Sequence, residues 1–129
     1  MGKQFLSPKG VYAHPTYSPG VKVSNTVYVS GQVGNDEQGN LVKGGFEAQA
    51  QRAFENMARI LEEGGASFKD VIKLNGYFTD AADNTANRKK YHEIRSKFFN
   101  PPLPIATNVI VCKPGSELLL EVEAVAVID

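Results

Sequence analysis

The chain has 129 residues, of which 42% are hydrophobic, and its 14 basic side chains balance 14 acidic ones to a formal net charge of zero. This length favours one domain spanning residues 1–129, and the composition excludes the disordered and fibrous classes. The balanced charge excludes strong long-range attraction to polyanions, so we expect neither RNA nor a membrane as a partner.

The cysteine content and the N-terminal residues favour the cytoplasm. The single cysteine, Cys112, cannot form an intrachain disulfide and is expected to be a small buried residue in a reducing compartment. The N-terminus lacks an apolar signal core, and no apolar run approaches the roughly 20 residues that span a bilayer. His14 and His92 have no metal-ligand spacing, so no metal is predicted.

The first third of the chain predicts β-structure. A short edge strand is expected at residues 3–6, and the proline-rich segment 8–20 that follows is a plausible wall of a site. Residues 21–33 contain two β-rich runs separated by Ser24 and Asn25. This pattern predicts a β-hairpin.

A helix and a strand are predicted in the middle of the chain. Apolar residues recur at helical spacing from Phe46 to Leu61, and the pair Gly64-Gly65 supplies a helix C-cap signal. Residues 71–78 are β-branched and aromatic, which is typical of a strand. Within it, Gly76 indicates a close backbone approach or a bulge.

The last third predicts a second helix and two strands. Helix-start residues at 80–84 begin a helix that runs to about Phe99, before the prolines of segment 101–104 prevent its continuation. Strands are expected at residues 105–111 and 118–128. The predicted order is therefore β-β-β-α-β-α-β-β.

The final strand has two different faces. Alternate residues of segment 118–128 form an unbroken apolar face suited to packing under helices. The opposite face has three apolar residues and the carboxylates of Glu121 and Glu123. Because two helices cover only one face of a sheet, this half-apolar face would be left in water. We therefore expect self-association, with any functional site between subunits.

Four segments, in this order, resemble the RidA/YjgF family of enamine and imine deaminases: YSPGV at 17–21, YVSGQ at 28–32, VIKLNGYFTD at 71–80 and EVEAVA at 121–126. The match covers nearly the whole chain. The resemblance implies an α+β fold similar to bacillus-type chorismate mutase, with two helices on one face of a six-stranded mixed sheet. It also implies a homotrimer in which three sheets form a central barrel, with a small-molecule cleft between adjacent subunits.

The resemblance implies hydrolysis of 2-imino or 2-enamino acids to a keto acid and ammonia, without a metal or an organic cofactor. Deaminating members hold the substrate carboxylate with an arginine in a Pro-x-Arg sequence that opens the penultimate strand. Here Ala106 stands at that position. A bidentate arginine supplies both charge and geometry, so its absence predicts either altered specificity or a non-catalytic binding or regulatory role.

Four other candidate site residues accompany Ala106. The resemblance implies that Glu121 positions or activates water, that the Tyr17 hydroxyl binds the ligand, and that the Gly31 backbone lies against it. The structural alternatives are a solvated strand carboxylate, a packing aromatic residue and a simple bulge. Asn108 lies two residues beyond Ala106, so it shares a side of the strand and could offer amide contacts there.

RNA cleavage or translation inhibition is a further function attributed to some relatives. The zero net charge and the lack of paired histidines argue against it, since neither backbone attraction nor acid/base chemistry on RNA is visible. Basic residues are frequent at 88–97, but such a run is interpreted as a solvated helix face.

Overall fold

The computed structural model describes residues 2–129 and contains one six-stranded sheet and two main helices. The elements are β1 (Lys3–Leu6), β2 (Gly20–Val23), β3 (Thr26–Gln32), α1 (Gly45–Glu63), β4 (Val71–Thr79), α2 (Thr85–Arg95), β5 (Ile105–Val111) and β6 (Leu120–Val127). Two 3-10 helices, Phe68–Asp70 and Asp80–Ala82, flank β4. The predicted order of strands and helices is confirmed.

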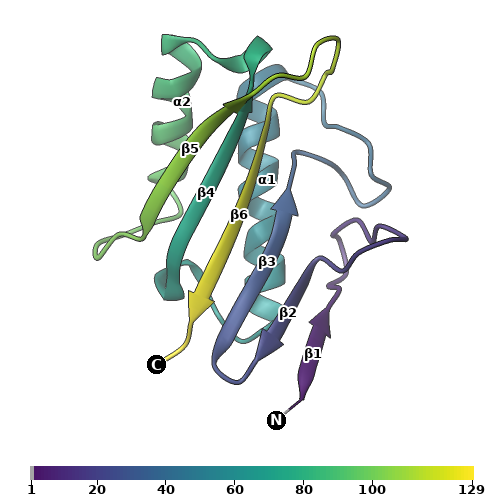
Figure 1. The fold of residues 1–129 in the computed structure, drawn as a ribbon, viewed down its shortest axis with the longest axis vertical. Helices are drawn as coiled ribbons and strands as arrows, with labels where there is room; N and C mark the ends of the chain where they lie inside the picture. The colour runs from purple at the N-terminus through teal and green to yellow at the C-terminus, as the bar shows by residue number, and fades with distance from the viewer. Residues whose placement is uncertain (1) are drawn as a thin grey trace.

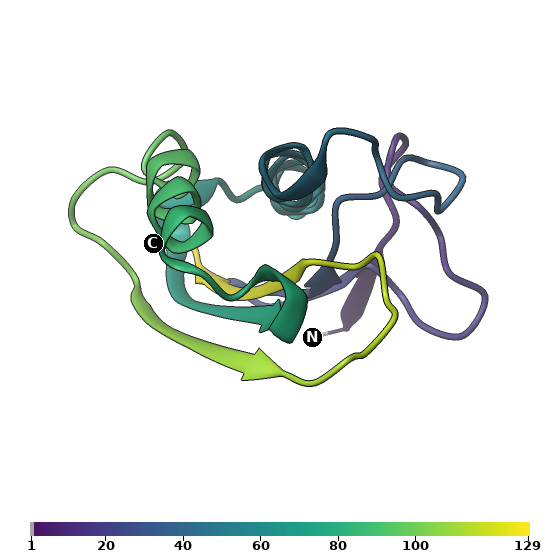
Figure 2. The ribbon, with the colours of Figure 1, turned by 90° about the horizontal axis from the view of Figure 1, so that it is seen from above.

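The sheet is mixed, with the strand order β1-β2-β3-β6-β4-β5 (Figure 1). Its strand pairs are antiparallel except for β4 and β5, which run parallel. Both helices lie on the same side of the sheet (Figure 2). The α+β architecture implied by the sequence is therefore confirmed, and within residues 2–129 no helix covers the other face of the sheet.

The core lies between this sheet and the two helices. Along β6, Leu120, Val122, Ala124 and Ala126 are buried, whereas the residues between them are only half-buried. The apolar stripe of α1 packs on them, and full burial of each large side chain contributes about 1.5–3 kcal/mol. The alternation read from the sequence therefore assigns the buried face of β6 correctly. None of the helices in residues 2–129 is long and apolar enough to cross a membrane.

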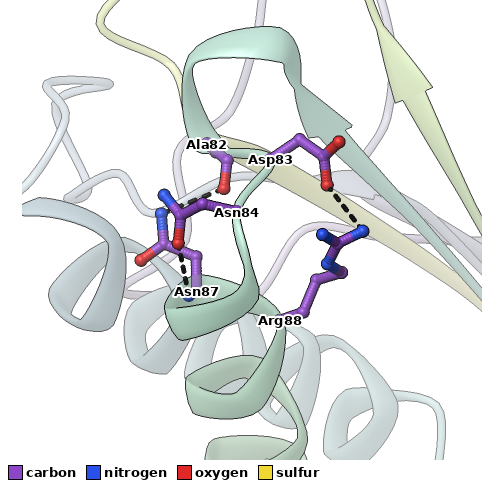
Figure 3. Close-up of polar contacts among 5 residues, drawn as sticks. All are labelled: Ala82, Asp83, Asn84, Asn87 and Arg88. Atoms are coloured by element: carbon purple, nitrogen blue, oxygen red, sulfur yellow. Dashed lines mark hydrogen bonds and ion pairs between the residues drawn. The ribbon is translucent and has the colours of Figure 1, made fainter.

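Side-chain amides fix the start of α2 (Figure 3). The backbone N–H of Asn87 donates to Asn84 Oδ1 at 2.8 Å, which caps the first turn. The Asn87 amide donates to the Ala82 carbonyl at 3.0 Å, and Arg88 forms an ion pair with Asp83 at 3.3 Å. These contacts start the helix at Thr85, directly after the helix-start residues 80–84 that the sequence indicates.

The predicted end of this helix is wrong. The helix ends at Arg95 rather than at Phe99, because the chain continues in turns closed by i→i+3 hydrogen bonds. The turns bring the rings of Phe98 and Phe99 to 5.3 and 6.2 Å from the ring of Phe54, measured between centroids. Packing onto this ring therefore replaces the last helical turn.

The predicted start of the last strand is also wrong, since β6 begins at Leu120 rather than at residue 118. The two preceding backbone N–H groups donate to side chains instead of to a neighbouring strand. Leu118 donates to Ser116 Oγ at 3.1 Å, and Leu119 donates to Gln49 Oε1 at 3.0 Å. The Gln49 amide also donates to the Glu117 carbonyl at 3.0 Å. Helix α1 therefore holds the entry to β6.

Strand β5 forms one edge of the sheet, and all of its residues are exposed. Cys112 follows directly after it and is exposed too. The prediction of a small buried cysteine is therefore wrong for the single chain, because no element in the described residues 2–129 covers this edge.

Candidate functional site

A row of side chains crosses the uncovered face of the sheet from one edge to the other. Strand register places its members side by side: Phe5, Val21, Tyr28, Val125, Lys73 and Ile105. Phe5, Tyr28 and Ile105 expose 65%, 47% and 69% of their surface. The half-apolar open face predicted from the last strand is therefore present in the structure.

A hollow of about 630 Å³ lies on this face. Strands β2, β3, β4 and β6 line it, together with Tyr17 and Ser18 from the segment before β2. Glu123, Asn75 and Lys73 contribute polar groups, and the members of this row on β1, β2, β3 and β6 contribute apolar ones. The predicted role of the proline-rich segment as a site wall is consistent with this position of Tyr17.

Glu123 is bound within its own chain. Its Oε1 accepts hydrogen bonds from the Tyr77 hydroxyl at 2.5 Å and from the Asn75 amide at 3.1 Å. The hydrogen bond to Glu123 is the main reason why the pKa of Tyr77 lies above its usual value, with burial and the charges of Glu123 and Glu121 adding to it. Glu123 is therefore an anchored hydrogen-bond acceptor, and Glu121 is the less constrained carboxylate.

Glu121 is half-buried and lies against Gly31 of the neighbouring strand. A Cβ atom on Gly31 would overlap Glu121 Oε1 and would lie 2.8 Å from Glu121 Cδ. The β3–β6 register shifts between Val29 and Gln32 at the same place. A glycine is therefore needed here because the Glu121 carboxylate occupies the space of a side chain. Within residues 2–129, no hydrogen bond or ion pair engages that carboxylate.

The surroundings of Glu121 change its proton affinity. Burial raises the pKa of Glu121 above the usual range, the Lys113 ammonium opposes this rise, and the charge of Glu123 adds to it. Burial also raises the pKa of Tyr17, and the nearby Glu121 carboxylate and Tyr12 contribute to that rise. Tyr17 is therefore a protonated hydrogen-bond donor near a carboxylate whose pKa is shifted towards neutral pH, as suits a general base.

Ala106 and Asn108 belong to a different region of the chain. Register aligns them with Leu74 and Gly76, which are buried on the helix-covered side of the sheet. A Cβ atom on Gly76 would lie 2.5 Å from Asn108 Oδ1 and 3.0 Å from the hydroxyl of Tyr91, so the predicted close approach at Gly76 is confirmed. The shared side of Ala106 and Asn108 is thus the side opposite to Glu121.

The structure therefore sorts the five candidate residues into two groups. Tyr17, Gly31 and Glu121 come together at the open face. Ala106 and Asn108 lie on the other side of the edge strand β5. No site that uses both groups forms within one chain.

Sequence reasoning missed two groups near Tyr17 and Glu121. The imidazole of His14 stacks on the Tyr17 ring, with 4.4 Å between centroids, and the Lys113 ammonium acts on Glu121. Both residues are in irregular segments, where no periodic pattern indicates the direction of a side chain. Residues 2–129 contain no cluster of three His, Cys, Asp or Glu side chains that could hold a metal ion.

The family model described as Endoribonuclease L-PSP matches residues 8–128. The chain belongs to this family, also called RidA/YjgF. A human 2-iminobutanoate/2-iminopropanoate deaminase is 39% identical over 115 residues, which cover 86% of this chain and 79% of the human one. The deaminase of the same name from Dermatophagoides farinae is 33% identical, with 96% and 100% covered.

A solved RidA structure from an Antarctic Psychrobacter bacterium has the same fold. Its TM-score to this RidA/YjgF chain is 0.85, with 35% identity and coverage of 97% of this chain and 99% of that one. The six-stranded sheet with two helices on one face is therefore the family architecture.

We expect Gly31→Ala to lower the catalytic activity of a site that uses Glu121 far more than it lowers the stability of the fold. The new methyl group meets the flexible end of Glu121, which can swing away at little cost in folding but then leaves its place in the site. A misplacement of this kind is expected to reduce kcat/KM by roughly 100-fold. Gly34→Ala is the contrasting variant, because its methyl group would lie 2.8 Å from the Gln49 carbonyl carbon and should lower the melting temperature. A Gly31→Ala protein with unchanged kcat/KM would contradict the assignment of Glu121 to the site.

Proposed function

We propose that this chain is a hydrolase of the enamine/imine deaminase type that acts as a homotrimer, with a substrate range altered at Ala106. The observation that carries the proposal is the Glu121 carboxylate, which is half-buried, engaged by no hydrogen bond in residues 2–129, and adjacent to Tyr17 and Gly31. The human and mite relatives named 2-iminobutanoate/2-iminopropanoate deaminase support the reaction type.

In the proposed reaction, Glu121 accepts a proton from a water molecule as the water oxygen bonds to the imine carbon. The electron pair of the C=N bond moves to nitrogen. Nitrogen takes this proton back from Glu121, which gives a neutral carbinolamine with an amino group and a hydroxyl group. Glu121 then removes the hydroxyl proton as the C=O bond forms and the carbon–nitrogen bond breaks. It passes this second proton to the departing nitrogen, so that ammonia leaves the carbonyl product. The raised pKa of Glu121 suits both transfers, because it brings the proton affinity of the carboxyl closer to the working pH.

The separation of the two residue groups supports an assembly in which neighbouring copies complete each site. Glu121 and its neighbours lie on the open face, whereas Ala106 and Asn108 lie on the far side of the edge strand. If the β5 edge of a second copy docks on the open face of the first, Ala106 and Asn108 of the second copy approach Glu121 of the first. The exposed apolar side chains of Phe5, Tyr28 and Ile105 in the row on the open face also favour burial between subunits.

Ala106 is expected to determine which substrates are accepted. Alanine offers no positive charge, so the cleft would favour a neutral substrate or one that is anchored by other groups, such as the Asn108 amide. A non-catalytic ligand-binding role is the second candidate, favoured by the same substitution. RNA cleavage is not favoured, because 14 basic residues are balanced by 14 acidic ones.

We expect Glu121→Gln to reduce imine hydrolysis by about 100- to 10,000-fold, the usual contribution of a general base. An amino-acid oxidase generates a panel of imines, semicarbazide traps them, and the suppression of the adduct by added protein is measured. Since the pKa of Glu121 is raised and the carboxylate is the active form, activity should fall on acidification at a higher pH than an ordinary glutamate would dictate.

Glu62→Gln, an exposed substitution in α1, is the control and should keep full activity. Full activity of Glu121→Gln would refute the role of the carboxylate. If the unmodified protein hydrolyses none of the imines, the non-catalytic reading is the correct one.

A further inference from the structure

Three aromatic rings form a column in the segment before β2, which we call the 12–17 column. It consists of Tyr12, His14 and Tyr17. The His14 and Tyr17 rings are stacked, with centroids 4.4 Å apart and planes only 14° from parallel. Tyr12 meets His14 edge-on, at 6.0 Å and 90°. Tyr17 forms the exposed end of the column, since 56% of its surface is accessible, and it lines the hollow.

The opposite end of the 12–17 column rests on a folded loop. A Cβ atom on Gly39 would lie 2.9 Å from Tyr12 Cε1, so the Gly39 backbone is packed directly against this ring. The loop itself is closed by Asp36, whose Oδ1 accepts the backbone N–H groups of Gln38 and Asn40, both at 3.0 Å. Tyr12 is therefore a fixed support for His14.

The orientation of the His14 ring is also fixed. Its Nδ1 is approached by the backbone N–H of Thr16 at 3.1 Å and by the Thr16 hydroxyl at 2.9 Å. Because a backbone N–H can only donate, Nδ1 is the acceptor, and the proton of the neutral ring is on Nε2. The imidazole therefore cannot rotate without losing these bonds.

The backbone and the side chain of Tyr17 are held by different groups. Directly after Tyr17, the carbonyl of Ser18 accepts the Ser30 hydroxyl at 2.6 Å, and the carbonyl of Pro19 accepts the Ser30 N–H at 2.9 Å. These contacts tie the backbone to β3. Within residues 2–129, His14 is the one ring that stacks on Tyr17.

We propose that His14 is a positioning residue that holds the Tyr17 ring in its binding orientation, an inference that rests on the proposed function of the Tyr17 and Glu121 site. A half-exposed tyrosine without a neighbour samples several side-chain rotamers, and ordering it during binding lowers affinity. Stacking on a fixed imidazole restricts the ring before the substrate arrives. The aromatic surface at this position, rather than proton transfer by His14, is what the site requires.

We expect His14→Ala to raise KM for the hydrolysed imine by roughly three- to tenfold, the range expected for ordering one side chain, with a smaller change in kcat. His14→Phe, which keeps a planar ring on Tyr17, should stay close to the natural KM. In the Tyr17→Ala background, His14→Ala should have no further effect, because the residue through which it acts is gone. His92→Ala removes the other histidine, which is exposed on α2, and is the matched control.

The proposal would be overturned if His14→Ala raised KM by the same factor in the natural protein and in the Tyr17→Ala background. A nuclear magnetic resonance measurement decides the same point without any substrate. Stacked rings shift each other's proton resonances, so the Tyr17 ring signals should move in His14→Ala and largely remain in His14→Phe, while signals from the core of the sheet stay in place. If no imine is hydrolysed, the proposed function fails by itself. Unchanged Tyr17 signals in His14→Ala would overturn the positioning role whatever the activity.

Discussion

The unmodified protein is expected to hydrolyse 2-iminobutanoate and 2-iminopropanoate about 100- to 1,000-fold more slowly than a relative that has an arginine at the position of Ala106. Losing a carboxylate anchor removes both charge and orientation, and a deficit of about 3–4 kcal/mol in transition-state binding corresponds to such a factor. Ala106→Arg should recover part of the activity. The semicarbazide-trapping assay, run at equal protein concentrations, measures all three proteins.

The geometry of β5 supplies a matched control for this variant. Ala106 is exposed in the single chain, so an arginine there can extend into solvent within its own subunit. Thr107 is adjacent in the same exposed strand but aligns with Asn75, on the opposite side. Thr107→Arg adds the same charge and length and should recover nothing. Natural activity equal to that of an arginine-bearing relative would show that Ala106 is not the disabling change.

Tyr28→Asp is expected to convert the proposed trimer into monomers at micromolar concentration. Tyr28 is in the middle of the exposed row, beside Val21 and Val125, and 47% of its surface is accessible in the single chain. An exposed tyrosine contributes little to the folding of one subunit. A carboxylate placed there would be buried without a partner on assembly, which costs several kcal/mol per subunit. Light scattering measures the mass, and thermal unfolding reports the stability of the subunit.

Glu55→Lys, an exposed substitution on the helix-covered side, should leave the mass of a trimer unchanged. A natural protein that is monomeric at this concentration would contradict the proposed assembly. So would a Tyr28→Asp protein that remains a trimer.

Local sequence patterns predicted those parts of the fold in which the conformation of a residue is determined by its neighbours in sequence. The alternation in β6 identified both its buried and its open face, and Ser24 with Asn25 marked the hairpin turn correctly. In this turn Ser24 has a positive φ of 53°. Contacts between distant residues were not predictable. Gln49, which is 70 residues from Leu119 in sequence, accepts the Leu119 N–H, and β6 therefore begins only at the next residue.

The candidate site also has one part that local patterns predict and another part that depends on contacts between distant residues. The side shared by Ala106 and Asn108 follows from strand periodicity alone. The pairing of β5 with β4 determines which face of the sheet this side belongs to. The residues of β5 alone do not predict that register. The stacking of His14 on Tyr17 was beyond prediction for another reason. The segment is irregular, so the spacing of two rings in sequence says nothing about their distance in space.

The tethers around the β5–β6 connection restrict where the length of this chain can change. The Lys113 N–H is bound to Asp80 Oδ1 at 3.0 Å, and Gln49 holds both sides of residue 118. Between these tethers, residues 114–116 form a turn that is closed by a hydrogen bond from the Ser116 N–H to the Lys113 carbonyl. An extra residue there would lengthen a surface turn and leave β6 in place. The same insertion at residue 120 would invert the parity of the strand, sending Glu121 beneath the helices and its apolar neighbours into water.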